Sequence, residues 1–303
     1  MPAQLKVTDD DLPAMYRATN AQSLRAQASY LQVHRAVLGL LVLGAITSSA
    51  AGVCAAVGPP LAIATAIFLF FGVIATASIR VMKQSNAWYD GRALAESAKS
   101  MAWKYMLRAA PYAGDDASSD KLLVQDLRKL LGDAKKGGIS SIVAADAEQI
   151  TARMRAVRAL TMAERLDVYK AERLRDQRQW YTTKAAAHDK FAFTWVIVAG
   201  LAQAFACVLS IAASHWIGAV GWVGVFTTIT SSTLTWTQLR RHEELAHSYA
   251  FTSHELGFVE ARLPSLQSES DLAQFVSDCE NAVSREHTMW RARRELAEPP
   301  SPV

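Results

Sequence analysis

The chain has 303 residues, of which 51% are hydrophobic and 20% are charged, and its formal net charge is +4. The basic residues lie beside long apolar stretches. This placement is typical of residues that set the orientation of membrane spans, and it argues against nucleic-acid binding. The three cysteines, Cys54, Cys207 and Cys279, are scattered along the chain. They predict neither a disulfide framework nor a metal site.

The first apolar region has no charged residue between Arg35 and Arg80, and Gly58-Pro59-Pro60 divides it. The two halves, residues 36–57 and 61–79, are each about long enough to cross a hydrocarbon core of ~30 Å at ~1.5 Å per residue. Proline disrupts helices, and the residue before it avoids the helical region. We therefore predict a helical hairpin that crosses the membrane twice and turns at Gly58-Pro59-Pro60.

A second apolar region of the same design lies between Lys190 and Arg240. Its predicted spans are residues 191–214 and 217–236, and two such hairpins in one chain indicate an internal repeat. The alternative is a soluble protein with long buried helices, but soluble cores seldom need uncharged stretches of this length. Basic residues flank the outer ends of both hairpins and the turns are uncharged, which predicts both termini and the middle segment in the cytoplasm.

The predicted fold is an all-α membrane protein with two transmembrane helical hairpins, four spans in total, and long amphipathic cytoplasmic helices. We divide the chain into a first unit at residues 1–112, a linker with a short helix at 113–143, and a second unit at 144–303 that ends in a C-terminal helix. Within the linker, Ala113 to Asp120 reads as loop and Lys121 to Leu131 as the helix. Thr161 and Glu164 form a predicted capping box at a helix start in the second unit.

Two sets of small or polar residues in the spans are candidates for helix packing or a pathway. Gly44, Ser48 and Gly52 recur every four residues in the first span, which lets helices approach closely. Thr227, Ser231 and Thr235 share one face of the fourth span, Gln238 extends that face, and Gln203 lies in the third span. These polar groups need partners in lipid, so they predict either hydrogen bonds between helices, which we favour, or a water-filled path.

Catalytic signatures are missing from the sequence. His242 and His247 flank two glutamates as in zinc proteases, but they are five residues apart instead of four and do not share a helix face. The glycines of the fourth span lack the strand–turn–helix context of a phosphate loop. We therefore predict a chain that is not an enzyme, with no catalytic residue, no cofactor and no metal ligand.

Charged and aromatic residues recur beside both hairpins. Before the second hairpin they are Arg165, Tyr169, Arg173, Asp176, Gln177, Trp180, Tyr181, Lys184 and Ala185. After the first hairpin they are Trp88, Arg92, Ala93, Glu96, Ser97, Lys99, Trp103 and Tyr105. The first pattern resembles the SLATT family, the SMODS- and SLOG-associating two-transmembrane effector domains of bacteria, and the second resembles another subtype. Glu286, Trp290 and Arg294 are similar to the terminal helix of the family.

The resemblance covers most of the chain as two tandem SLATT-like units. Its candidate cytoplasmic motif is Trp88, Arg92, Glu96, Trp103, Arg173, Gln177, Trp180 and Tyr181. The resemblance implies a multi-pass protein of the bacterial inner membrane, an effector of conflict or antiphage defence systems. It would form an oligomeric pore or ion channel, or perturb the membrane, and be gated through its cytoplasmic helices.

The apolar spans and the placement of the basic residues predict membrane lipid as a partner and no nucleic acid. The resemblance implies further copies of the chain and either a separately encoded sensor or nucleotide-signal protein or sensing by the cytoplasmic helices themselves. The alternative function is a non-conducting membrane scaffold that recruits cytoplasmic partners.

Overall fold

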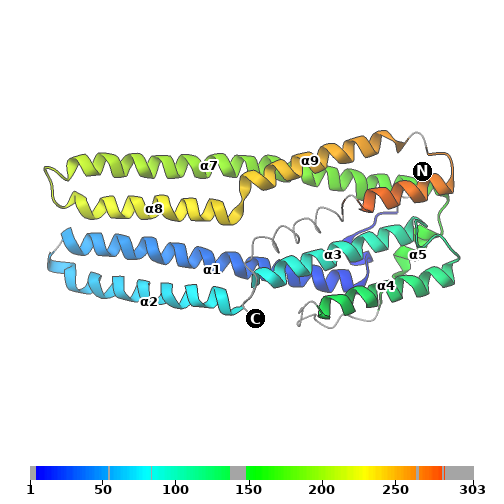
Figure 1. The fold of residues 1–303 in the computed structure, drawn as a ribbon, viewed down its shortest axis with the longest axis horizontal. Helices are drawn as coiled ribbons and strands as arrows, with labels where there is room; N and C mark the ends of the chain where they lie inside the picture. The colour runs from blue at the N-terminus through cyan, green and yellow to red at the C-terminus, as the bar shows by residue number, and fades with distance from the viewer. Residues whose placement is uncertain are drawn as a thin grey trace. The chain divides into compact units, whose positions relative to one another are not determined.

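A computed structural model describes residues 5–53, 55–82, 84–136, 148–263, 266–281 and 283 of the chain (Figure 1). Every regular element within these ranges is helical, and none is a β-strand. The predicted all-α class is therefore confirmed. Glu286, Trp290 and Arg294, which carry the resemblance at the C-terminal end, lie outside the described residues, as does Cys54.

The chain folds into two units, each built from separate segments of the sequence. Unit 1 comprises Met1–Ala28, Gln84–Gln179 and His254–Val303. Unit 2 comprises Ser29–Lys83 and Trp180–Ser253. Each unit therefore combines residues from the first and the second half of the chain.

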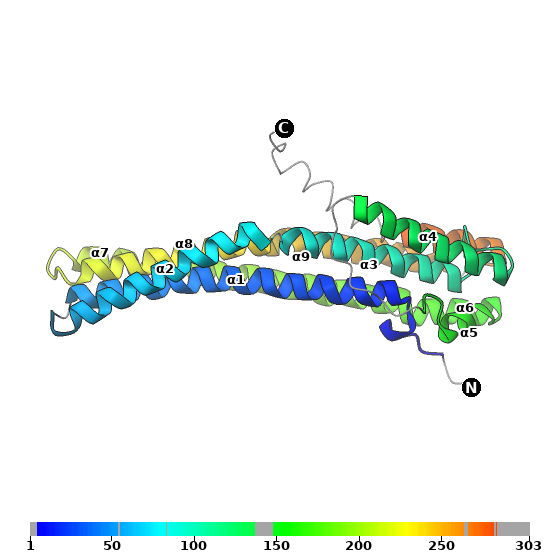
Figure 2. The same ribbon diagram turned by 90° about the horizontal axis from the view of Figure 1, so that it is seen from below.

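Unit 2 consists of two helical hairpins followed by the start of a further helix. Helices α1 (Ala14–Val53, from Ser29 onward) and α2 (Gly58–Met82) are joined by the short 3₁₀ turn η2 (Ala55–Val57). Helices α7 (Asp176–Ala212, from Trp180 onward) and α8 (Ala219–Arg240) form the second hairpin, and α9 (His242–Ala261) follows. Figures 1 and 2 show both hairpin turns at the same end of this unit.

Three helical stretches are long and apolar enough to cross a membrane by length and composition: Ala14–Val53, Gly58–Ile79 and Met162–Ala212. Large apolar side chains on them point outward, such as Phe70, Phe193 and Val208, each more than half exposed. Lipid-facing helices need such a surface because lipid, unlike water, solvates it well. Helix α8 has 22 residues, but the eight serines and threonines between Thr227 and Thr237 make it less apolar. A fourth span stays a prediction.

Three differences between the observed and the predicted helix boundaries have a clear structural cause. Gly58-Pro59-Pro60 occupies the first turn of α2 instead of the turn before it, because a helix start tolerates residues without a backbone N–H. The sequence predicts one helix over residues 238–263 after the fourth span, but the structure breaks this helix at Arg241. The backbone of Arg241 is left-handed (φ 47°), and its N–H donates to the Thr237 carbonyl at 2.8 Å. This residue ends α8 and starts α9.

The third difference is the start of α4 (Asp116–Lys136), which lies five residues before the predicted Lys121. Asp115 explains the early start, because its side-chain oxygen accepts a hydrogen bond from the Ser118 backbone N–H at 3.0 Å. A side-chain acceptor at this position satisfies a backbone donor of the first turn. Residues 116–120 of the predicted loop are therefore helical.

Unit 1 is a bundle of shorter helices. It contains η1 (Asp9–Asp11), α3 (Gln84–Met106), α4, α5 (Ala152–Arg158), α6 (Met162–Tyr169) and the π-helical turn η3 (Lys170–Arg175), and residues 269–281 are helical as well. Its core is rich in aromatic side chains, including Trp103, Tyr169 and Phe275, all at most 2% exposed. The predicted capping box is confirmed, since Thr161 and Glu164 exchange both side-chain-to-backbone bonds at the start of α6.

Candidate functional site

The hydroxyl row on α8 is the first candidate site. Thr227, Ser231, Thr235 and Gln238 are all exposed on the outer side of unit 2. The Thr227 hydroxyl donates to its own helix at the Gly224 carbonyl (3.0 Å), and the Thr235 hydroxyl donates to the Ser231 carbonyl (2.8 Å). Two of the four side chains thus hydrogen-bond to carbonyls of their own helix, and all four lie on its exposed face. We call these four residues the polar row.

Packing of the opposite face fixes the orientation of α8. Val225, Thr233 and Trp236 are buried on that face. The Ser49 hydroxyl of α1 donates to the Gly221 carbonyl at 2.6 Å, and a Cβ at Gly221 would lie only 3.1 Å from that hydroxyl oxygen. The glycine is therefore needed for close contact between α1 and α8.

The predicted packing residues of the first span lie in different surroundings. A Cβ at Gly44 would lie 3.3 Å from the Leu69 side chain of α2, whereas Ser48 and Gly52 are exposed. The serine that is buried is Ser49, the residue after the predicted Ser48. It lies five residues from Gly44, so the four-residue spacing did not predict it. Gln203 is exposed on α7.

The second candidate site is a buried charge pair in unit 1. Arg173, in the π-helical turn, donates to the Glu280 carboxylate through Nε at 2.9 Å and through Nη2 at 2.8 Å. Tyr169 (3.0 Å) and Ser100 (2.7 Å) donate hydroxyl hydrogen bonds to the same carboxylate. Glu280 and Arg173 are only 1% and 2% exposed, so the pair is fully removed from water. π-Helical turns often occur at functional positions.

Burial and charge set the protonation of this network. Burial lowers the pKa of Arg173, but the Glu280 carboxylate more than offsets this, so the pKa lies above its ordinary value. Burial, reinforced by the same carboxylate, raises the pKa of Tyr169. Burial also raises the pKa of the neighbouring Cys279 thiol to about 12. At neutral pH the network therefore holds one charged arginine against one carboxylate, with a neutral phenol and thiol beside them.

The predicted cytoplasmic motif is partly collected around this pair. Arg173 Nη1 donates to Gln177 at 3.4 Å, and the Trp103 ring meets the Tyr169 ring edge-on at 5.6 Å. Arg92 pairs with the buried Glu96 at 2.7 Å on α3. Trp88, also on α3, accepts a hydrogen bond from Ser23 at its carbonyl (2.9 Å).

The other two motif residues belong to unit 2. Trp180 and the buried Tyr181 pack edge to face, with ring centroids 5.1 Å apart, and both contact the Tyr249 ring.

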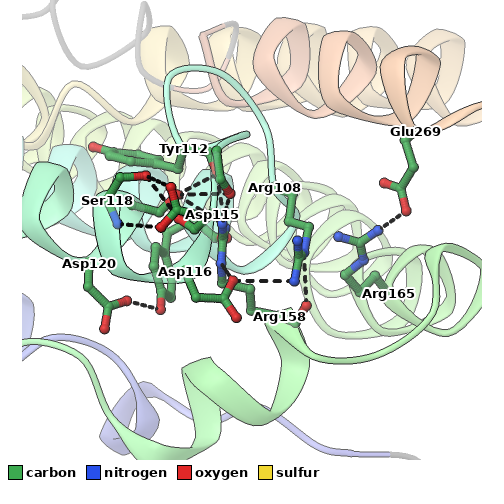
Figure 3. A network of polar contacts seen from close by, with 12 residues as sticks. Arg108, Tyr112, Asp115, Asp116, Ser118, Asp120, Arg158, Arg165 and Glu269 are labelled. Carbon is green, nitrogen blue, oxygen red and sulfur yellow. Dashed lines mark hydrogen bonds and ion pairs between the residues drawn. The ribbon is translucent and has the colours of Figure 1, made fainter.

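Sequence reasoning did not identify Glu280 or Ser100, because their partners are 107 or more residues away along the chain. It also missed Arg158, which fixes the turn between α3 and α4 (Figure 3). The buried Arg158 guanidinium donates to the carbonyls of Tyr105 (2.6 Å), Tyr112 (3.0 Å) and Gly114 (2.8 Å). It also donates to Ser119 and pairs with Asp116. Figure 3 shows Arg165 beside this cluster, paired with Glu269.

Across the described ranges, no three histidine, cysteine, aspartate or glutamate residues lie close enough to hold a metal ion. The buried Glu280 carboxylate of unit 1 is fully occupied by Arg173 and by the hydroxyls of Tyr169 and Ser100, as in a structural ion pair. What unit 2 adds is a set of long apolar helices, one of them with a polar outer face. Together these features define an integral membrane protein of the all-helical class.

Comparison with protein-family models identifies the class more closely. Residues 13–166 match SMODS and SLOG-associating 2TM effector domain 3, and residues 169–290 match SMODS and SLOG-associating 2TM effector domain 1. The chain therefore belongs to the SLATT family and carries two of its domains in tandem. No curated protein and no solved structure matches the chain.

Proposed function

We propose that this protein is a non-enzymatic membrane effector whose copies assemble so that the polar row of α8 lines a water-filled path. The observation that carries the proposal is the outward position of Thr227, Ser231, Thr235 and Gln238 on a helix whose other face is buried in its own unit. The hydroxyl oxygens can still accept hydrogen bonds and the Gln238 amide can donate and accept them, and lipid offers no partner, so coverage by a neighbouring copy or by water is favoured.

The proposed topology has four crossings. Each family domain is described as 2TM, and two tandem domains supply two hairpins. The location of both hairpin turns at one end of unit 2 supports a common far side for the two turns (Figure 1). We place the protein in the bacterial inner membrane, with both termini cytoplasmic, because basic residues flank the outer ends of both hairpins.

Unit 1 is the proposed receiver of the signal. The family description names these domains as effectors that associate with SMODS and SLOG, which supports a role in a conflict or antiphage defence system. A separately encoded sensor or nucleotide-signal protein would act on unit 1. Helices α1 and α7 contribute residues to both units, so they offer a continuous covalent route from the signal to the spans.

The test replaces the hydroxyls of the polar row by valine in Thr227→Val/Ser231→Val/Thr235→Val. The matched control, Thr230→Val/Ser232→Val/Thr237→Val, removes as many hydroxyls from half-buried positions of the same helix. We expect the purified wild type and the control to conduct in planar bilayers and the row variant to lose conductance at equal expression.

Equal behaviour of the two variants, or a wild type that never conducts when reconstituted with its triggering partner, would overturn the proposal. The latter result would favour the alternative, a non-conducting membrane scaffold that recruits cytoplasmic partners.

A further inference from the structure

Three cations of unit 2 lie near the ends of the apolar stretches, two of them on one tryptophan ring. Arg35 directly precedes the apolar part of α1, and Arg240 is the last residue of α8. Both guanidinium groups lie over the ring of Trp236, with their central carbons 5.2 Å and 5.8 Å from its centroid. Lys184 of α7 lies over the Trp180 ring at 5.8 Å. We call Arg35, Lys184 and Arg240 the cation cluster.

In the described part of the chain, no carboxylate lies within 4.0 Å of the charged nitrogens of Arg35, Lys184 or Arg240. The adjacent Arg241 differs, because it pairs with Glu244. Burial lowers the pKa of Arg240, and the positive charge of Arg35 lowers it further because the two guanidinium groups repel each other.

Two histidines extend the cluster between α7 and α9. Their Nδ1 atoms, of His188 and His242, are 3.0 Å apart, and their rings are 4.9 Å apart. Burial lowers the pKa of both, and the charge of Arg240 lowers it further. Both imidazoles are therefore neutral at neutral pH, and an anion beside them would favour their protonated forms.

We propose that the cation cluster binds a phosphate group, supplied in the membrane by the headgroup of an anionic phospholipid. Guanidinium groups match phosphate oxygens with two parallel N–H donors, and a phosphate would relieve the repulsion between Arg35 and Arg240. Tryptophan side chains prefer the headgroup level of a bilayer, which is where Trp236 lies if α8 crosses the membrane. The inference rests on that proposed crossing.

The test measures thermal unfolding of the full chain in detergent as a short-chain phospholipid is added. Phosphatidylglycerol should raise the unfolding midpoint of the wild type in a saturable way, and phosphatidylcholine should not. In Arg35→Gln/Arg240→Gln the apparent affinity for phosphatidylglycerol should fall about 30-fold, from ~1 kcal/mol for each basic residue lost. Arg241→Gln, which removes a neighbouring but already paired cation, should bind like the wild type.

Three results would contradict the inference. An unchanged affinity in the double variant would show that the cation cluster is not the binding site. An equal response to phosphatidylcholine would show that the site does not recognise the negative charge of the headgroup. Saturable stabilisation by inorganic phosphate alone, lost in the double variant, would keep a phosphate site but overturn its assignment to lipid. Arg35→Lys/Arg240→Lys, which keeps both charges, checks that a loss in the glutamine variant is not misfolding.

Failure of the membrane proposal is seen separately. If the helices do not cross the membrane, carbonate extraction of wild-type membranes would release the protein, whatever its response to phospholipid.

Discussion

Replacing Glu280 by glutamine should destabilise unit 1 strongly. The substitution keeps the shape of the side chain but removes the negative charge that Arg173 contacts through two nitrogens at 2.8–2.9 Å. Both side chains are at most 3% exposed, so water cannot replace the lost partner. Leaving a buried charge unpaired costs about 3–5 kcal/mol. At about 2–4 °C per kcal/mol for domains of 150–250 residues, the midpoint of thermal unfolding should fall by about 6–20 °C.

Glu260→Gln is the matched control for this experiment. Glu260 also pairs with two arginines, Arg175 at 3.2 Å and Arg178 at 2.8 Å, but these arginines are at least half exposed. Exposed pairs contribute about 0–1 kcal/mol each, so the loss of both should shift the midpoint by at most ~8 °C. The assay is circular dichroism of the purified full-length protein in detergent. A shift for Glu280→Gln no larger than that of Glu260→Gln would refute the reasoning that the pair is buried and structural.

Three further predictions concern the packing and charge of both units. Burial, His188 and Arg240 lower the pKa of His242 to about 4, so the unfolded chain binds more protons between about pH 6.5 and 4. Acidification from pH 7 to 5 should therefore lower the unfolding midpoint of the wild type, and His242→Asn should reduce that loss. A variant with the same pH dependence as the wild type would contradict the assignment to His242. Gly221→Ala should lower the free energy of unfolding by about 1–3 kcal/mol, because its Cβ would lie 3.1 Å from Ser49. Gly224→Ala, where a Cβ would meet no atom within 4 Å, should raise it by up to ~1 kcal/mol. Melting in detergent measures both, and shifts of the same sign would count against the contact. Arg158→Met leaves the carbonyls of Tyr105, Tyr112 and Gly114 without their donor, and each buried unsatisfied group costs about 1–3 kcal/mol of the free energy of unfolding in urea. Arg155→Met, at an exposed pair, should cost no more than about 1 kcal/mol, and equal effects would refute the assigned role of Arg158.

Local rules were sufficient to predict much of the fold. The absence of charge between Arg35 and Arg80 marked the first hairpin, and its two helices are among those long and apolar enough to cross a membrane. The capping box at Thr161 and Glu164 was predicted because its partners are three residues apart. Boundaries set by single side chains were missed, since a helix start at Asp116 depends on how the Asp115 carboxylate turns toward the Ser118 amide.

The candidate sites were less accessible to sequence reasoning. The shared face of Thr227, Ser231 and Thr235 follows from helix periodicity, but its outward direction depends on the contact of α1 with Gly221. Arg173 was singled out by the family pattern. Its partner Glu280 was not, because nothing local in the sequence indicates which carboxylate will be buried beside a given arginine.

Cysteine accessibility along α8 tests the central claim most directly. In a chain whose native cysteines are replaced, single cysteines are introduced at Thr227, Ser231, Thr235 and the buried Val225, and the assembled protein in membranes is exposed to a membrane-impermeant thiol reagent. The account predicts reaction at the three positions of the polar row, with a change in conductance, and no reaction at Val225. Lack of reaction at every row position would mean that α8 is packed in a dry bundle, and equal reaction at all four would mean that it does not cross the membrane.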